Sequence, residues 1–331
     1  MNEPIRPILR LSGLTKNYGT HAAIRDLSFD VFEGDVFGFL GPNGAGKSTT
    51  MYIIAGLVKP SAGAVELFGK PLGNDPEIRR DMGVLIETPA FYDYLSGRRN
   101  LEILARVHGN VPFSRVAQVL ARVGLADRAK DPVREYSHGM KQRLGIAQAL
   151  LASPRLVVLD EPTNGLDPEG SATVWELLRN LAREDRITIL VSSHLLHEVE
   201  ESCNRIAVIN QGILVACDNV KSLLFFNKED NLLLFDSEAV CRQAEAVLKT
   251  MPGVEILPVD ETGGDSAEGP ALKVRMRQGV AGDVVTRLVE NRAAPRAVIP
   301  QRKTLKQFFL ELTRRQTRLT PASGVTSIKK E

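Results

Sequence analysis

The sequence predicts an α/β fold with a mixed sheet, followed by a smaller α+β domain. Three observations support this prediction. A glycine-rich loop at 41–48 lies between an apolar run at 36–40 and a helix-forming stretch that begins at Lys47. A second apolar run, 156–159, ends in two adjacent carboxylates. After about residue 220, strand-like and helix-like segments alternate in a different pattern, which indicates a separate unit.

The glycine-rich loop is a complete G-x-x-x-x-G-K-S phosphate loop in the strand–loop–helix context that this motif requires. Its glycines let backbone N–H groups and the helix N-terminus point at phosphates. Lys47 supplies positive charge to the β- and γ-phosphates, and the Ser48 hydroxyl can bind Mg²⁺. A turn that binds nothing is disfavoured because all four fixed positions are present. We therefore expect a P-loop NTPase, with its nucleotide bound by Gly41, Pro42, Asn43, Gly44, Ala45, Gly46, Lys47, Ser48 and Thr49.

The two carboxylates Asp160 and Glu161 follow a strand of the buried type. In a parallel α/β sheet, ligands bind at the carboxyl ends of the strands, so this pair is expected beside the phosphate loop. Asp160 is then placed to hold Mg²⁺, and Glu161 to activate the attacking water as a general base. A strand that simply ends in a polar turn would explain one acid better than an adjacent pair.

A third motif, Tyr-Ser-His-Gly-Met-Lys-Gln-Arg at 136–143, opens a helix shortly before the second apolar run. Ser137 is a good helix N-cap, and taken alone the segment is an ordinary capped helix. In this position it resembles the signature motif of ATP-binding cassette (ABC) proteins, usually Leu-Ser-Gly-Gly-Gln. The resemblance implies that Ser137 and Gly139 contact nucleotide.

The resemblance continues in order along about 220 residues. Tyr18 matches the aromatic that stacks on adenine in this family, although it could also be a surface or strand aromatic. Gly165-Leu166-Asp167 matches the loop that communicates between two sites of a dimer. His194 matches the switch histidine at the γ-phosphate, although it could also be a histidine at a helix N-terminus. The joint occurrence of these matches favours the family roles.

Three positions depart from the usual family pattern. His138 replaces a glycine and Met140 replaces a glutamine of the signature, whereas Glu87 stands where the family usually has glutamine. The segments around these residues resemble the subgroup that handles bacitracin and lantibiotics, in which these variants are usual. The resemblance implies that Glu87 lies near the γ-phosphate and Mg²⁺.

The resemblance implies the ATP-hydrolysing subunit of an ABC exporter. Two copies of the chain would sandwich two MgATP molecules, and a separate integral-membrane permease would dock on the region Glu87–Leu104. The alternative is a soluble ABC protein that acts in translation or DNA repair. A purely regulatory module would lack Glu161 or Lys47. GTPase-like patterns at 227–230 and 167–170 lie in the wrong structural setting.

Composition fits a cytoplasmic protein. The 331 residues include 42 basic and 40 acidic side chains, and the net charge of +2 gives no signal for nucleic acid. Three widely spaced cysteines indicate reduced thiols rather than a disulfide framework or a metal cluster. The N-terminus has no apolar signal region, and no apolar stretch approaches the ~20 residues of a membrane-spanning helix. We therefore expect a peripheral protein at the cytoplasmic face of the membrane, whose transport path belongs to another chain.

The predicted organisation has three parts. Residues 8–221 form the nucleotide-binding domain, with a helical insert at about 88–152. Residues 230–315 form an accessory domain with the element order β-α-β-β-α-β, which is found in ferredoxin-like modules. Residues 316–331 are polar and are expected to be a disordered tail.

Overall fold

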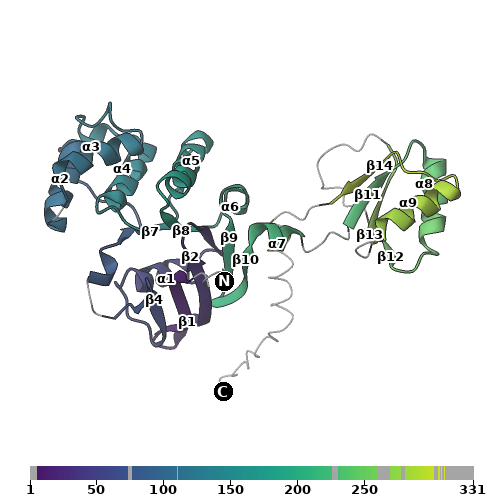
Figure 1. Ribbon diagram of the computed structural model, residues 1–331, viewed down its shortest axis with the longest axis horizontal. Helices are drawn as coiled ribbons and strands as arrows, with labels where there is room; N and C mark the ends of the chain where they lie inside the picture. The colour runs from purple at the N-terminus through teal and green to yellow at the C-terminus, as the bar shows by residue number, and fades with distance from the viewer. Residues whose placement is uncertain are drawn as a thin grey trace, which may run out of the picture. The chain divides into compact units, whose positions relative to one another are not determined.

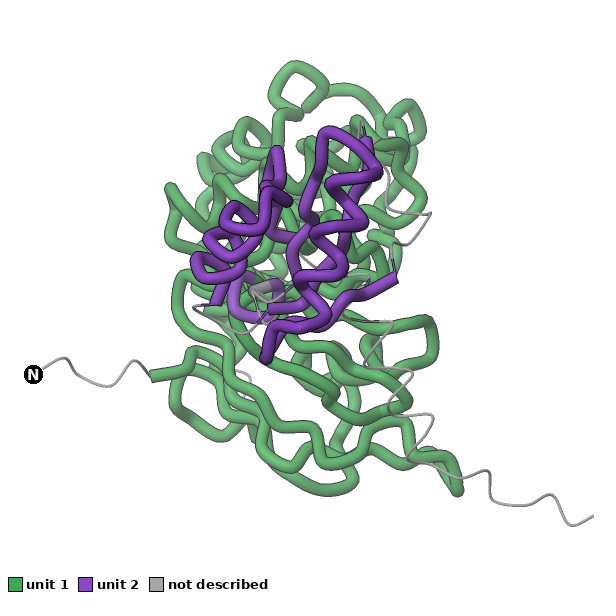
Figure 2. Tube along the Cα trace, turned by 90° about the vertical axis from the view of Figure 1, so that its right-hand side faces the viewer, with its two compact units in different colours: residues 1–220, 309–331 green, residues 221–308 purple. Residues whose placement is uncertain are grey.

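The computed structural model describes residues 6–73, 77–109, 111–225, 230–258, 269–276 and 280–301, with Leu305, Gln307 and Phe309. Within this part of the chain, one compact unit comprises the residues up to Val220 together with Phe309, and a second begins at Lys221; Figure 2 gives each unit its own colour. The tail expected at 316–331, and residues 227–229 of the rejected GTPase pattern, lie outside the described residues. No helix in the described ranges is long and apolar enough to cross a membrane.

A six-stranded sheet with the order β10-β9-β3-β8-β7-β6 forms the centre of the first unit (Figure 1). Its strands are β3 (Val36–Leu40), β6 (Met82–Leu85), β7 (Leu156–Asp160), β8 (Thr188–Ser193), β9 (Arg205–Asn210) and β10 (Ile213–Asn219). Five strands run parallel, and β10 pairs antiparallel with β9. The central strands β3 and β8 are buried along their whole length, as apolar strands covered on both faces are. The predicted mixed α/β sheet is confirmed.

An antiparallel sheet, β2-β1-β4-β5, lies over one face of this centre. It consists of β1 (Pro7–Tyr18), β2 (His21–Phe32), β4 (Ala62–Leu67) and β5 (Lys70–Pro71). Helix α1 (Lys47–Ile54) buries Met51 and Ile54 in the core that both sheets share. The helices α5 (Pro168–Glu184) and α6 (Leu196–Ser202) contact the central strands. They cover the opposite face, because Phe37 and Phe39 point into the shared core whereas Gly38 between them faces Val199 of α6.

Three helices pack together beside the sheets: α2 (Gly97–His108), α3 (Phe113–Arg122) and α4 (His138–Leu150) (Figure 1). Short 3₁₀ turns lie at η1 (Glu77–Arg79) and η2 (Val133–Glu135). The expected N-cap is present, since the Ser137 hydroxyl accepts a hydrogen bond from the Met140 N–H at 3.2 Å. The hairpin between β9 and β10 turns at Gln211 and Gly212, whose positive φ angles of 49° and 79° are typical of a tight hairpin turn.

The second unit contains a four-stranded antiparallel sheet with the order β12-β13-β11-β14. After α7 (Val220–Phe225), its elements are β11 (Asp230–Leu234), α8 (Glu238–Leu248), β12 (Val254–Leu257), β13 (Ala271–Met276), α9 (Ala281–Glu290) and β14 (Ala297–Pro300). Fully buried Leu233, Val274, Leu248 and Leu288 bring one sheet face and both helices into a single core. This unit therefore has an apolar core of its own.

Candidate functional site

The phosphate loop leaves the carboxyl end of β3 and enters α1, as predicted. Gly46 caps the helix with a φ of 105°, which disfavours any other residue. A Cβ atom at Gly41 would lie 2.4 Å from the Ile209 carbonyl oxygen, and one at Gly46 would lie 2.6 Å from that of Ala23. The loop therefore needs glycine at both positions because neighbouring backbone approaches it closely.

The loop forms one wall of an open cavity of about 450 Å³. The cavity is lined by Tyr18, His21, Ala23, Asn43, Gly44, Gly46, Lys47, Ser48, Thr49 and Glu161. Tyr18 is about half exposed at the rim, with the Lys16 ammonium 4.9 Å from its ring centroid. His21 lines the same cavity, although no motif in the sequence marks it. An exposed aromatic ring beside a loop of backbone N–H donors can bind a ligand that carries both a base and phosphates.

Lys47 is almost fully buried and contacts three oxygen atoms. Its Nζ lies 2.8 Å from the Gly41 carbonyl oxygen, 3.3 Å from that of Pro42 and 3.1 Å from Glu161 Oε1. Gly41 and Pro42 therefore do not line the cavity, but their carbonyl oxygens hold the lysine ammonium group. Ala45 is buried within the loop. The ammonium group is thus fixed at the cavity wall beside the predicted catalytic carboxylate.

Asp160 ends β7, and Glu161 follows it with a left-handed φ of 48°. The Glu161 N–H donates to the Ser192 hydroxyl at 2.9 Å, and that hydroxyl donates to Asp160. The second Glu161 carboxylate oxygen lies 2.9 Å from His194 Nδ1. The structure therefore brings the predicted lysine, both carboxylates and the histidine together, and it adds Ser192, which orients the pair of acids.

A second cavity, of about 650 Å³, also has Glu161 in its lining. Ser48, Glu87, Thr88, His138, Gln142, Asp160, Glu161, Asn164 and Gly165 line it. Ser48, Asp160 and Glu87 offer oxygen atoms, which are the ligands that Mg²⁺ prefers. No three His, Cys, Asp or Glu side chains gather as a metal site within the described residues. Carboxylate and hydroxyl oxygens of this kind suit Mg²⁺, which keeps water and phosphate oxygens among its ligands.

Glu87 has a partner that sequence reasoning missed. The Tyr52 hydroxyl, on α1, donates a hydrogen bond to Glu87 Oε1. This bond, together with burial of the phenol, raises the pKa of Tyr52 to about 12. Glu87 itself has a left-handed φ of 64°. The contact links the helix after the phosphate loop to the strand end at Glu87, and nothing local in the sequence marks it.

The signature motif reaches the second cavity through His138 and Gln142, but not through its two predicted nucleotide contacts. Ser137 is exposed and caps α4, and neither it nor Gly139 is among the residues that line the cavities. His138, one of the departures from the family pattern, has its Nε2 atom 3.1 Å from the Asn164 carbonyl oxygen. Its ring therefore connects the start of α4 to the loop that follows Glu161.

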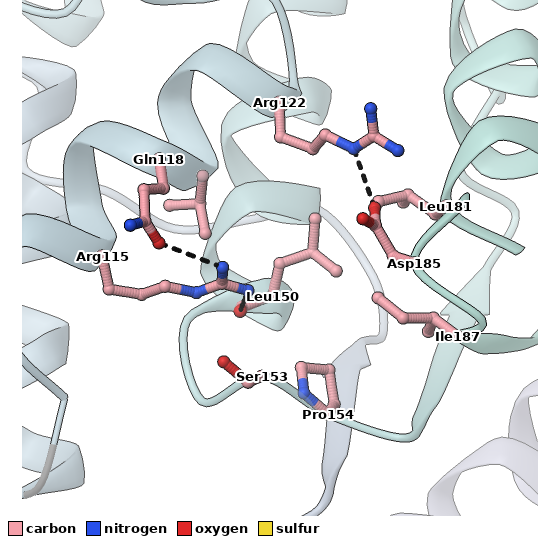
Figure 3. Close-up of a pocket in the computed structure, with 10 residues that line it drawn as sticks. Arg115, Gln118, Arg122, Leu150, Ser153, Pro154, Leu181, Asp185 and Ile187 are labelled. Atoms are coloured by element: carbon pink, nitrogen blue, oxygen red, sulfur yellow. Dashed lines mark hydrogen bonds and ion pairs between the residues drawn. The ribbon is translucent and has the colours of Figure 1, made fainter.

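A third cavity, of about 360 Å³, is formed by α3, the end of α4 and the end of α5 (Figure 3). Its charged groups are paired within the protein: Arg122 Nε lies 2.8 Å from Asp185, and Arg115 donates to the Leu150 carbonyl oxygen at 3.0 Å. It contains none of the predicted site residues. We assign it no part in nucleotide binding.

Comparison with known proteins agrees with this geometry. The ABC transporter family model matches residues 24–164. The chain is 42% identical over 260 residues to the uncharacterized ABC transporter ATP-binding protein YhcH of Bacillus subtilis, covering 76% of this chain and 84% of that protein. It is 45% identical to the bacitracin transport ATP-binding protein BcrA of Bacillus licheniformis, over 63% and 68% of the two chains. It is 31% identical to the linearmycin resistance ATP-binding protein LnrL of Bacillus subtilis, over 94% of this chain and 100% of that protein.

Among solved structures, the chain resembles the dimeric post-hydrolysis structure of the ATP-binding cassette MJ0796 bound to ADP and Pi. The TM-score is 0.58 and the identity 26%, over 64% of this chain and 98% of the other. The resemblance predicted from the phosphate loop, the signature and the switch histidine is confirmed. This chain belongs to the ABC transporter family, as one of its ATP-binding ATPases.

Proposed function

We propose that this chain hydrolyses ATP as the nucleotide-binding subunit of an exporter and thereby powers a separate membrane permease. The observation that carries the proposal is the meeting of Lys47, Asp160, Glu161 and His194 beside the phosphate loop. Relatives named for bacitracin transport and linearmycin resistance support export, and they do not favour the soluble alternative in translation or DNA repair.

In this proposal the chain binds ATP in the cavity of the phosphate loop. Tyr18 stacks on the adenine, and the loop N–H groups with Lys47 bind the phosphates. Ser48, Asp160 and Glu87 would hold Mg²⁺, which would neutralise phosphate charge. Lys47 already contacts three protein oxygens, so phosphate binding replaces one of them, and Glu161 is the partner that can turn away because it is a side chain.

Glu161 then acts on water. Its carboxylate accepts a proton from the water whose oxygen forms the new bond to the γ-phosphorus. The bond between that phosphorus and the β–γ bridging oxygen breaks, and ADP and phosphate leave. His194 contacts the carboxylate at 2.9 Å and orients it, while it also donates to the γ-phosphate. These roles are those that a P-loop NTPase requires of a base and an orienting donor.

Ser137 is exposed and lines neither cavity, which supports a role toward a second copy of the chain. In this arrangement Ser137 and Gly139 of one copy contact the nucleotide on the phosphate loop of the other. The dimeric structure of MJ0796 supports the same assembly. The complex lies at the cytoplasmic face of the membrane, and residues 230–315 form an accessory domain of it.

The test uses the purified full-length chain. We expect MgATP hydrolysis by the chain alone, and a change in rate when it is reconstituted in vesicles with a candidate membrane protein, sought among the products of neighbouring genes. Absence of hydrolysis in both preparations would contradict the ATPase role. Hydrolysis that never responds to the membrane protein, together with no co-purification, would contradict the transport role.

A first prediction concerns the permease-docking loop. Tyr92 and Tyr94 are 54% and 70% exposed, with ring centroids 5.9 Å apart. Buried Asn100 holds the loop by accepting from the Tyr92 N–H and donating to its carbonyl oxygen. We expect Tyr94→Ser to weaken permease binding by about tenfold or more, because truncated aromatic anchors cost about 2 kcal/mol at interfaces.

Co-purification and vesicle-binding titrations measure this change. Phe113→Ser is the matched control, because Phe113 is also an exposed aromatic residue but lies at the start of α3, outside the loop. Reversing the charge of Arg98 or Arg99 is a less direct test, because both arginines pair with Glu102. Equal loss of binding in the Tyr94 and Phe113 variants would remove the loop as the docking site.

A second prediction concerns Glu87. Glu87→Gln should leave basal ATP hydrolysis within about twofold of wild type, since the amide oxygen can still accept from Tyr52 and can still serve as a neutral oxygen ligand for Mg²⁺. It should alter the coupling of hydrolysis to transport, measured as substrate export per ATP consumed. Loss of all nucleotide binding in this variant would instead indicate a structural role.

A further inference from the structure

Glu198 accepts hydrogen bonds from three side chains. It lies in α6, the helix that begins after His194. Its Oε2 accepts from the Thr163 hydroxyl at 3.0 Å and from the Trp175 indole N–H at 2.8 Å, and its Oε1 accepts from the Ser171 hydroxyl. Ser171 and Trp175 belong to α5, whereas Thr163 belongs to the loop after Glu161. One carboxylate therefore joins three segments of the chain.

The three donors are nearly inaccessible to solvent. Thr163, Ser171 and Trp175 are 5%, 7% and 2% exposed. Hydrogen bonds to a carboxylate are stronger than neutral ones, and a buried donor that loses its acceptor is left unpaired. The contacts of Glu198 are therefore costly to break, and they hold the three segments in one arrangement.

These contacts close a ring around the predicted catalytic groups. Thr163 follows Glu161 by two residues, and Glu198 follows His194 by four. The Thr163–Glu198 hydrogen bond joins the two segments at one end, and the 2.9 Å contact between His194 Nδ1 and Glu161 joins them at the other. The histidine and the carboxylate therefore lie within one closed set of contacts that includes the Thr163–Glu198 bond.

The His194 side chain is 38% exposed, so packing alone restrains its ring only weakly. We propose that Glu198 is a positioning residue for ATP hydrolysis. Through Thr163 it fixes the loop after Glu161 against the helix after His194, and it thereby sets the contact between the switch histidine and the base. This inference rests on the proposed roles of Glu161 and His194.

A simpler explanation is that Glu198 only holds α6 against α5. Its bonds from Ser171 and Trp175 do join these helices, and so does the bond from Arg179 Nη1 to the Ser202 hydroxyl, at 2.8 Å. The bond from Thr163 differs because it reaches the loop. Thr163→Val and Ser202→Ala therefore separate the two explanations, since each removes one hydroxyl and only the first acts on the loop.

The experiment measures kcat, KM for ATP and the thermal midpoint of the full-length wild type and both variants. We expect Thr163→Val to lower kcat by about tenfold or more with KM little changed, because small displacements of reacting groups can cost up to about 10²-fold in rate. Ser202→Ala should keep the wild-type kcat even where its thermal midpoint falls as far as that of Thr163→Val.

Glu198→Gln supplies a conservative rescue. Its amide oxygen can accept from Thr163 and Trp175, and its amide nitrogen can donate to the Ser171 hydroxyl, so we expect kcat near that of wild type. Glu198→Ala should lower kcat by about as much as Thr163→Val does. A normal kcat in Thr163→Val, or an equal loss in Ser202→Ala, would overturn the positioning role. A wild-type chain that hydrolyses no ATP would instead overturn the proposed function.

Discussion

Lys47→Ala is expected to lower kcat/KM for ATP by about a thousandfold. The Lys47 ammonium is the buried positive charge of the phosphate loop, and it lies at the wall of the cavity that would hold the phosphates. Removing a preorganised donor from a site where charge develops costs about 10²–10³-fold, and a lysine that also binds the ground-state phosphates should reach the upper end. Steady-state ATPase assays measure the loss of turnover, and titration with a fluorescent ATP analogue measures the loss of ATP binding.

The variant also changes the protein around it. The Gly41 and Pro42 carbonyl oxygens lose the Lys47 donor, and the Glu161 carboxylate keeps its contact with His194. A thermal melt is therefore needed to show that the fold persists. Lys70→Ala is the control, because Lys70 is an exposed lysine on β5, outside both nucleotide-site cavities. Lys47→Ala with wild-type turnover would show that this phosphate loop does not bind phosphate.

The phosphate loop was predictable because its geometry depends on adjacent residues. The strand before Gly41 and the helix from Lys47 are set by local pattern, and the chain joins them directly. The same holds for the caps at Ser137 and Asp167, whose hydroxyl and carboxylate accept from N–H groups three residues later. Such contacts can be read from spacing alone.

Contacts between distant segments could not be predicted in this way. Tyr52 and Glu87 are 35 residues apart, and Ser192 and Asp160 are 32 apart. Each pair meets only because neighbouring elements of the sheet place their ends together. The role of Glu198 is of the same kind, since its donors come from a loop and from another helix. Sequence pattern gives the ends of strands and helices, whereas these pairings require the register between them.

The roles of Ser137 and Gly139 raise a different difficulty. Their positions were predicted from a family resemblance, and the single chain explains them only as the start of α4. If they contact nucleotide on a second copy, then no distance within one chain can measure that contact. Their function is a property of the assembly, and only an experiment that forms the dimer can test it.

Glu161→Gln is the variant expected to form that dimer. The amide is a poor base, so we expect kcat to fall by about 10²–10⁴-fold, the usual contribution of a positioned general base. Glutamine has the shape of glutamate, and its oxygen can still accept from Lys47 while its amide group faces His194. ATP binding should therefore persist, and hydrolysis should stall with ATP held between two copies. Gel filtration with MgATP should then show a dimer that wild type shows only briefly.

Glu169→Gln is the matched control, because Glu169 is an exposed glutamate in the first turn of α5 and contacts none of the site residues described above.

Combining Glu161→Gln with Ser137→Arg tests the signature at the same time. A bulky cation at the exposed helix cap should abolish the ATP-dependent dimer without changing the fold of the monomer. In the proposed dimer, each nucleotide site has Glu161 from one copy and Ser137 from the other. A dimer that forms in Glu161→Gln but not in the double variant would therefore place Ser137 at the partner's nucleotide. Wild-type turnover by Glu161→Gln would show that another group activates the water, and a dimer unaffected by Ser137→Arg would remove the signature from the interface.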